Sequence, residues 1–248
     1  ILIFFFYKNF LYAQDLYSFE TKSIEIIENG KLVKAKQGKA ISTDKDIEII
    51  ADNFQYSKTS KKLEIKGNAV ILINSTNLRI EFDEGFINQN NLLFKSQEEV
   101  KLNYLSQNIQ IKSKSISFNR KEKIIESNNK STISDKFGNK STVDIFKYDL
   151  NKNLLKIKNL DFYDKEQNNF KLEIAYINTE TNNLYGKDVI VNLNDKNLKI
   201  NKNNDPRLRG NSVENNNEFT IIKKGIFTTF LQVFILVFLF DHAQICVA

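Results

Sequence analysis

Hydrophobic and polar residues alternate along most of the chain between residues 47 and 193. In the stretch IEIIADNFQY, residues 47–56, apolar side chains recur at about every second position. This period of two predicts a β-strand with one face toward a core and the other toward water. A polar turn follows at residues 57–62, SKTSKK, and an alternating stretch then returns over residues 62–72. The pattern therefore predicts an antiparallel strand pair.

This strand pair repeats along the chain with a spacing of 31 residues. Two weaker copies follow, beginning at Val143 and Phe170. A period of this length indicates a stacked array, in which each unit buries its apolar face only against its neighbours. We therefore expect an all-β protein, with stacked antiparallel strand pairs over residues 47–200. The positions that coincide after shifts of 31 are Ile47, Leu78 and Ile109; Ile49, Ile80 and Ile111; Tyr56, Ile87 and Phe118; and Leu63, Phe94 and Ile125.

The interior of such an array can take two forms. Two layers of strands lined by Ile, Leu, Phe and Tyr can close into a dry core, or they can stay open along one seam as an apolar groove that suits acyl chains. The alternation fits both forms, and inward aromatic residues such as Phe54, Tyr56, Phe146 and Tyr176 do not distinguish them. The residues that we expect to face inward and to contact acyl chains, if the seam is open, are Ile80, Phe82, Ile111, Ile116, Phe118, Ile145 and Tyr148.

The two ends of the chain differ from the middle. Residues 1–13 contain an apolar run and end in Leu-Tyr-Ala before Gln14, which is typical of the back part of a signal peptide. We interpret residues 14–46 as a lead-in to the array and residues 201–229 as a linker. Residues 226–240 carry no charge, but this run is short for a membrane helix and lacks the alternation of a membrane strand. We interpret residues 230–248 as an aberrant hydrophobic tail.

Composition and charge limit the classes of ligand and of active site that this chain can have. The net charge is +6, but lysines are spread along the chain among acidic residues, and no arginine cluster predicts a nucleic-acid site. The positive net charge fits contact with anionic lipid head groups better than contact with a nucleic acid. The only cysteine, Cys246, and the only histidine, His242, lie in the last seven residues, so a Ser-His-Asp triad or a zinc site in the folded body is excluded. No carboxylate pair stands out, and we expect no enzyme activity, no metal and no cofactor.

The unit ADNFQYSKTSKKLEIKGNAVI, residues 51–71, resembles the OstA-like β-jellyroll repeat of lipopolysaccharide-transport proteins. The phrases NDPRLRG, residues 204–210, and KKGIFTT, residues 223–229, are similar to the segment that joins this jellyroll to the outer-membrane barrel in the LptD family of lipopolysaccharide-assembly proteins. This family usually continues after FTT into a cysteine, where this chain has Phe230. The repeat is carried by Ala51, Tyr56, Lys62, Leu63, Gly67 and Val70.

The resemblance implies a periplasmic domain, associated with the outer membrane in the full-length family. Such a domain receives lipopolysaccharide from a periplasmic bridge protein by edge-strand pairing, holds the acyl chains inside the jellyroll and passes them toward the outer membrane. Its partners in the family are the barrel and the lipoprotein that plugs the barrel. Residues 201–229 would then link the jellyroll to a barrel that this chain lacks. The domain is a conduit and no catalyst.

The sequence also allows two other interpretations of the function. The chain can be a free periplasmic bridge protein of the same fold, although the linker phrase and the tail argue against it. It can also be an exported β-solenoid that acts as an adhesin or a glycan-binding protein, although such solenoids usually have shorter rungs. The ligand separates these readings, because the first two bind lipid A and the third binds a glycan.

Overall fold

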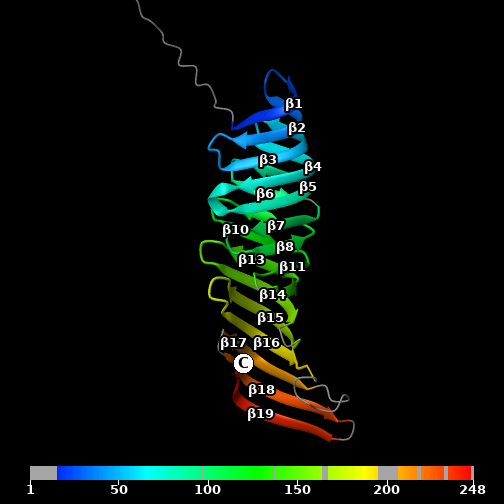
Figure 1. The fold of residues 1–248 in the computed structure, drawn as a ribbon, viewed down its shortest axis with the longest axis vertical. Helices are drawn as coiled ribbons and strands as arrows, with labels where there is room; N and C mark the ends of the chain where they lie inside the picture. Colours follow the sequence, from blue (N-terminus) through cyan, green and yellow to red (C-terminus); the bar gives the residue numbers. More distant parts are fainter. Residues whose placement is uncertain are drawn as a thin grey trace, which may run out of the picture.

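The computed structural model describes residues 16–96, 98–136, 138–163, 167–194, 206–216, 219–231 and 234–246, with side chains described as far as residue 228. The described chain is nearly all β, and its strands form one large antiparallel sheet, which confirms the predicted fold class. Figure 1 shows that the strands lie across the long axis of an elongated molecule and follow one another along it in chain order. No helix in the described part of the chain is long and apolar enough to cross a membrane.

The strands of the described residues are β1 (Tyr17–Ile27), β2 (Leu32–Ser42), β3 (Ile47–Ser57), β4 (Lys62–Ile73), β5 (Leu78–Asn88), β6 (Leu93–Ser96), β7 (Val100–Tyr104), β8 (Ile109–Ser113), β9 (Ser117–Asn119), β10 (Ile124–Ser127), β11 (Ser131–Ser134), β12 (Lys140–Val143), β13 (Ile145–Asp149), β14 (Leu154–Tyr163), β15 (Asn169–Asn178), β16 (Leu184–Asn192), β17 (Arg207–Asn215), β18 (Phe219–Leu231) and β19 (Phe234–Cys246).

The sheet is a long meander in which four passes of the chain are each split into two short strands. β5 pairs with β6 through one half of its length and with β7 through the other. β6 then pairs with β9, and β7 pairs with β8, so the two halves of each pass stay in step. The same arrangement continues through β10 and β11 and through β12 and β13, until β14 spans both halves again.

A polar corner bends each pass in the middle. Asn68, Asn159 and Asp188 have left-handed backbones at this point, a conformation that Asn and Asp tolerate better than most residues. The Asn68 amide donates to the Asp52 carboxylate at 2.8 Å, and the Asn159 amide donates to Asp144 at the same distance. The corner divides the sheet into two facing walls. We call wall A the half that contains β6, β9, β10 and β13, and wall B the half that contains β7, β8, β11 and β12 (Figure 1).

The register explains the repeat in the sequence. Two passes of the chain make one repeat, so positions that coincide after a shift of 31 residues lie in the same column across the strands. All of these column residues are buried, and together they form much of the core. The inner column of wall A is Tyr56, Leu63, Ile87, Phe94, Phe118, Ile125 and Tyr148. The inner column of wall B is Ile49, Ile71, Ile80, Leu102, Ile111 and Ile133.

The sheet also extends beyond the repeats found in the sequence. Residues 14–46, expected to be a lead-in, contain β1 and β2, which pair with each other, and β2 also pairs with β3. Residues 201–229, expected to be a linker, contain β17 and most of β18, which continue the sheet from β16. The shift of 31 residues misses β17 and β18 because the long polar stretch before β17 breaks the spacing. Part of the hydrophobic tail forms β19, paired with β18. The signal-like residues 1–13 lie outside the described residues.

Candidate functional site

Opposite the polar corner, the turns of wall A and wall B approach each other along a line that we call the seam. In the N-terminal half, polar side chains bridge it. Arg120, in the turn between β9 and β10, extends from wall A to Asp46 in the turn between β2 and β3, with 2.8 Å between Nη2 and Oδ2. The same guanidinium lies 3.6 Å from Asp44. The Arg120 side chain is only 13% exposed, so this bridge is largely shielded from water.

The surroundings of this bridge shift two pKa values. The Ser42 hydroxyl donates to Asp44 and lowers the pKa of that carboxyl, and the Asp46 N–H and the Arg120 guanidinium contribute in the same direction. Beside it, Gln89 donates to the Tyr17 hydroxyl across the seam at 2.5 Å. Burial raises the pKa of Tyr17 well above its usual range, so the phenol stays protonated.

A cluster of polar and aromatic side chains ends the closed part of the seam. The Tyr104 and Tyr148 rings meet edge to face, with their centroids 6.0 Å apart. The Tyr148 hydroxyl donates to the Gln107 carbonyl oxygen at 3.0 Å and lies 2.8 Å from the Thr179 hydroxyl. Gln107 also donates across the seam to Asn153 at 2.7 Å. Burial raises the pKa of Tyr148 well above its usual range.

Beyond this cluster, toward the C-terminal end, the walls separate around a cavity of about 310 Å³. This is at the lower end of the range for small-molecule sites. The apolar part of the lining comes from both walls, and the polar part forms a rim of amides and hydroxyls with Asp135 and Lys136. The apolar lining residues are Ile109, Ile133, Leu155, Ile157, Phe162, Phe170, Ile177, Leu184 and Val213. The polar ones are Gln107, Asp135, Lys136, Asn139, Ser141, Thr179, Asn182, Asn215, Asn216 and Thr220.

The cavity forms where the inward side chains of wall B become smaller. Its inner column continues from Ile133 to Ser141, so a small polar residue replaces the isoleucine or leucine of earlier strands. The turn before Ser141 is held by Asp135, which accepts from the backbone and the side-chain amide of Asn139 at 3.0 and 2.8 Å. Next in the column, Phe162 and Phe170 stack with 4.9 Å between their ring centroids. They leave space between themselves and Leu155 on wall A.

The structure buries six of the seven side chains that we expected to contact lipid. Ile80, Phe82, Ile111, Ile116, Phe118 and Tyr148 are all at most 6% exposed. None of the six lines the cavity, although Tyr148 hydrogen-bonds to two residues of its rim. Their contact with lipid stays a prediction.

Ile145 and Tyr176 point outward, so the prediction that they face inward is wrong. Ile145 is 38% exposed and Tyr176 is 37% exposed. The corner is the physical reason, because it shifts the alternation within a pass. Val143 and Phe146 are both buried although they are three positions apart, an odd spacing that strict alternation would not allow, and the corner residue Asp144 lies between them.

The side chains predicted to contact lipid lie in the central repeats, so the prediction does not include the residues that line the cavity. Phe162, Phe170, Ile177 and Leu184 belong to the weaker repeats, where the alignment by 31 residues fades. One feature of the sequence indicates the position of the cavity, since Ser141 is a small polar residue in an otherwise apolar column. Without the register, however, that column is not visible in the sequence.

An apolar cavity with a polar rim can hold an amphiphile, with its hydrocarbon part between the walls and its head group at the rim. In the part of the chain with described side chains, no group of three or more His, Cys, Asp or Glu residues is placed to hold a metal ion. Comparison with models of known protein families and with curated proteins found no match to this chain.

Proposed function

We propose that this chain is a periplasmic lipopolysaccharide-binding conduit domain. It receives lipopolysaccharide from a periplasmic bridge protein and passes it toward the outer membrane. The observation that carries the proposal is the apolar cavity between walls A and B, which begins where the polar bridges across the seam end. The resemblance of residues 51–71 to the OstA-like repeat supports the same class of ligand.

The apolar lining and the polar rim of the cavity suit the two parts of a glycolipid. Acyl chains gain roughly 0.8 kcal/mol for each methylene group removed from water, so an apolar space between two strand layers favours hydrocarbon. The rim supplies donors and acceptors from Asn139, Asn182, Asn215 and Thr179. These groups suit the sugar and amide groups of a glycolipid head. Buried polar groups of the ligand need such partners, because an unmade hydrogen bond costs about 1–3 kcal/mol.

Photocrosslinking tests the proposal. A photoreactive phenylalanine analogue replaces Phe170 in the cavity, and in separate proteins it replaces the outward neighbour Lys171 and the closed-core residue Phe118. After irradiation with lipopolysaccharide, we expect a lipid adduct at Phe170 and none at Lys171. Each protein is first shown to be folded by its β-sheet circular dichroism. A folded protein without an adduct at Phe170 contradicts the proposal.

Competition separates the conduit from a glycan-binding protein. Purified lipid A should suppress the adduct at Phe170, and delipidated polysaccharide should not. Suppression by the polysaccharide alone would favour the glycan-binding alternative. An adduct at Phe118 would place lipid in the N-terminal half as well, and the seam there would then have to open during binding.

A further inference from the structure

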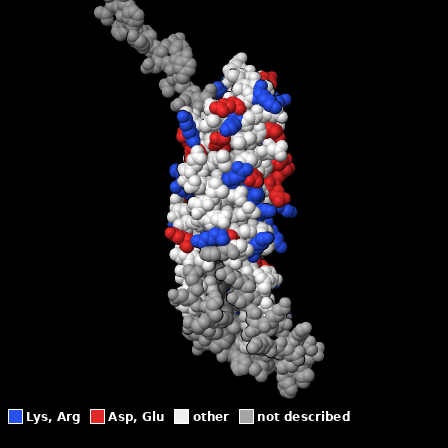
Figure 2. All heavy atoms as spheres, viewed as in Figure 1, with Lys and Arg blue, Asp and Glu red and all other residues white. Residues whose placement is uncertain are grey.

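The outer surface of the N-terminal half carries charges of both signs, paired across strands or along one strand. Lys39 lies 2.8 Å from Glu48, and Lys66 lies 2.8 Å from Glu84. Glu81 contacts Arg79 at 2.7 Å and Lys101 at 3.7 Å. Figure 2 shows the two signs interspersed over the face in view. This surface therefore presents no large excess of either sign.

The outer face of wall A in the C-terminal half is different. Across β13, β14, β15 and β16, the register places Lys147, Lys156, Tyr176 and Tyr185 in one row. A second row, beside the corner, contains Ile145, Lys158, Ile174 and Lys187. We call these eight residues the Lys/Tyr face.

The four lysines of the Lys/Tyr face are exposed, and none of them has a carboxylate of the described residues within ion-pair distance. The acidic residues at the ends of the first row are Glu126, opposite Lys147, and Glu214, opposite Tyr185. Exposed Asp144, Glu173 and Asp188 border the second row. Within the two rows themselves, the four lysines are the only charged residues, and none is held in an ion pair with a described residue, so their ammonium groups are available to attract anions.

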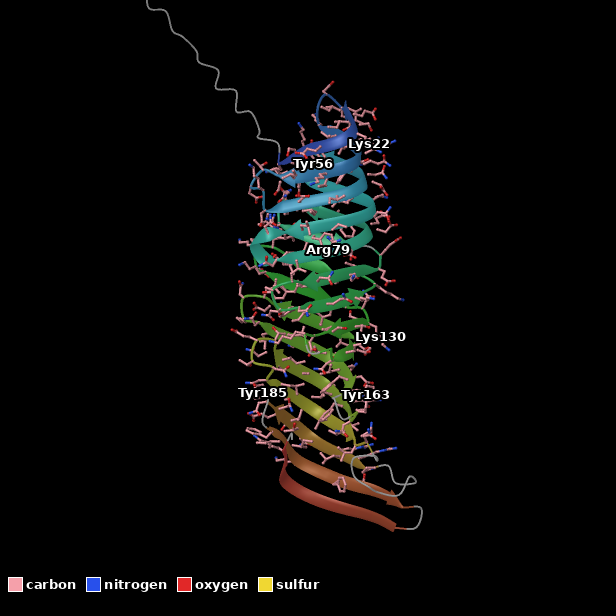
Figure 3. All side chains as sticks on the ribbon, viewed as in Figure 1. Lys22, Tyr56, Arg79, Lys130, Tyr163 and Tyr185 are labelled. Atoms are coloured by element: carbon pink, nitrogen blue, oxygen red, sulfur yellow. The ribbon has the colours of Figure 1, made fainter. Side chains whose placement is uncertain are left out.

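Exposed aromatic and aliphatic groups lie among these lysines. Tyr185 is 49% exposed, and Figure 3 shows it at the outer surface, on the opposite side of the molecule from Tyr163. The Lys156 ammonium lies 5.6 Å from the centre of the Tyr176 ring. Ile145 adds an aliphatic group that is 38% exposed. The face thus combines positive charge with amphipathic and apolar side chains.

We propose that the Lys/Tyr face binds the surface of an anionic lipid membrane. Tyrosine favours the boundary between water and hydrocarbon, because its ring is apolar and its hydroxyl is polar. Lysine stems can lie along apolar surface while the ammonium groups reach lipid phosphates. Each lysine near an anionic membrane contributes about 1 kcal/mol.

The composition favours a membrane over a nucleic acid or an acidic protein. The eight positions contain no arginine, which is the residue that nucleic-acid sites prefer for bidentate phosphate contacts. The positions belong to adjacent strands of one sheet wall, a geometry that suits a planar partner.

The inner faces of the same strands line the cavity through Leu155, Ile157, Ile177 and Leu184. Binding through the Lys/Tyr face would therefore bring the cavity close to the lipid head groups. The inference concerns a different surface from the cavity, and it can hold or fail independently of the proposed lipopolysaccharide site.

Vesicle flotation of the full chain tests the inference. We expect binding to vesicles of phosphatidylcholine with phosphatidylglycerol, weaker binding to phosphatidylcholine alone, and loss of binding at high salt. The double variant Lys156→Glu/Lys158→Glu should weaken binding to the anionic vesicles by at least about tenfold. The matched control is Lys34→Glu/Lys36→Glu, which reverses two exposed lysines on wall A in the N-terminal half. This control changes the net charge equally and should have a much smaller effect.

A second variant tests the aromatic contribution without changing the charge. Tyr176→Ser/Tyr185→Ser should weaken binding several-fold while leaving its salt dependence unchanged. Equal loss in both charge-reversed proteins would overturn the inference, because binding would then follow net charge alone. Absence of binding to anionic vesicles would overturn it as well. If the chain instead binds soluble polyglutamate and not vesicles, an acidic macromolecule is the partner and the membrane is not.

Discussion

At the scale of single residues, close backbone contacts limit what each position tolerates. Gly38 lies at the corner of β2, where a Cβ atom would be 2.1 Å from the backbone oxygen of Glu20 on β1. No heavy atom lies within 4 Å of the corresponding position at Gly30, in the turn before β2. Both glycines have a positive φ, +158° at Gly38 and +84° at Gly30. A substitution therefore strains the backbone at both positions, but only at Gly38 does the added Cβ atom also clash with a neighbouring strand.

We predict that Gly38→Ala lowers the free energy of unfolding by about 2 kcal/mol or more, because β1 and β2 must move apart. Gly30→Ala should cost about 1 kcal/mol, the backbone strain alone. Urea denaturation of both variants measures the difference. Equal losses would mean that β1 adjusts to the added methyl group without cost.

The two buried tyrosines make stability depend on pH in the alkaline range. Burial raises the pKa of Tyr17 and of Tyr148 above the ordinary value of 10.0. Above about pH 10 the unfolded chain loses these protons while the folded chain keeps them, so stability falls as the pH rises. Below about pH 9 both states hold the protons, and the effect vanishes.

We therefore predict that the double variant Tyr17→Phe/Tyr148→Phe loses stability less steeply above pH 10 than the unchanged protein. The slopes should differ by up to about 1.4 kcal/mol per pH unit for each tyrosine. Denaturation midpoints from pH 8 to 11 measure this difference, since lysine titration is common to both proteins. Parallel curves would show that the folded phenols ionise normally.

At the scale of elements, turns far apart in the sequence hold the seam closed. Arg120 and Asp46 are separated by 74 residues, and they join the β9–β10 turn to the β2–β3 turn. Asp46 also accepts from the backbone N–H of Ser75 at 2.7 Å and from its hydroxyl at 3.0 Å. One carboxylate thus links two turns of wall B to one turn of wall A.

We predict that Arg120→Ala lowers the free energy of unfolding by about 1.5–3 kcal/mol, because it leaves Asp46 without its cationic partner. Arg79→Ala is the control, since Arg79 pairs with Glu81 on the exposed outer face and should contribute at most about 1 kcal/mol. Thermal or chemical denaturation compares them. A cost at Arg120 no larger than that at Arg79 would show that the bridge does not hold the seam.

At the scale of the whole molecule, the bent sheet has a closed N-terminal half and a C-terminal half with a cavity. Phe118 is fully buried in the first half, between Phe94 and Ile125 in the column of wall A. Phe162 lies in the second half, where it lines the cavity and stacks on Phe170. The same residue type therefore has different roles in the two halves.

We predict that Phe118→Ala costs about 3–5 kcal/mol, the usual cost of emptying a packed core. Phe162→Ala should cost clearly less, because its ring already faces open space, and it should alter lipid crosslinking at Phe170. Denaturation and the crosslinking assay give the two measurements. A larger loss of stability at Phe162 than at Phe118 would contradict the division into a closed half and a half with a cavity.

The strands, their polar turns and most inward positions follow from local alternation, because a strand that buries one face must place apolar residues at every second position. For this reason the repeat correctly indicated that Phe118, Ile80 and Ile111 are buried. The prediction from alternation is wrong at Ile145 and Tyr176, where the corner shifts the alternation.

The position of the cavity depends on the tertiary structure, because it lies between residues far apart in the chain. Ile109, Phe162 and Leu184 line it together only when two bent walls face each other. The seam is likewise bridged by residues far apart in the chain, such as Arg120 and Asp46, a contact that no local pattern encodes. Local periodicity reports which face of a strand is buried, but whether two buried faces meet or stay apart depends on the side-chain volumes that the register brings opposite each other.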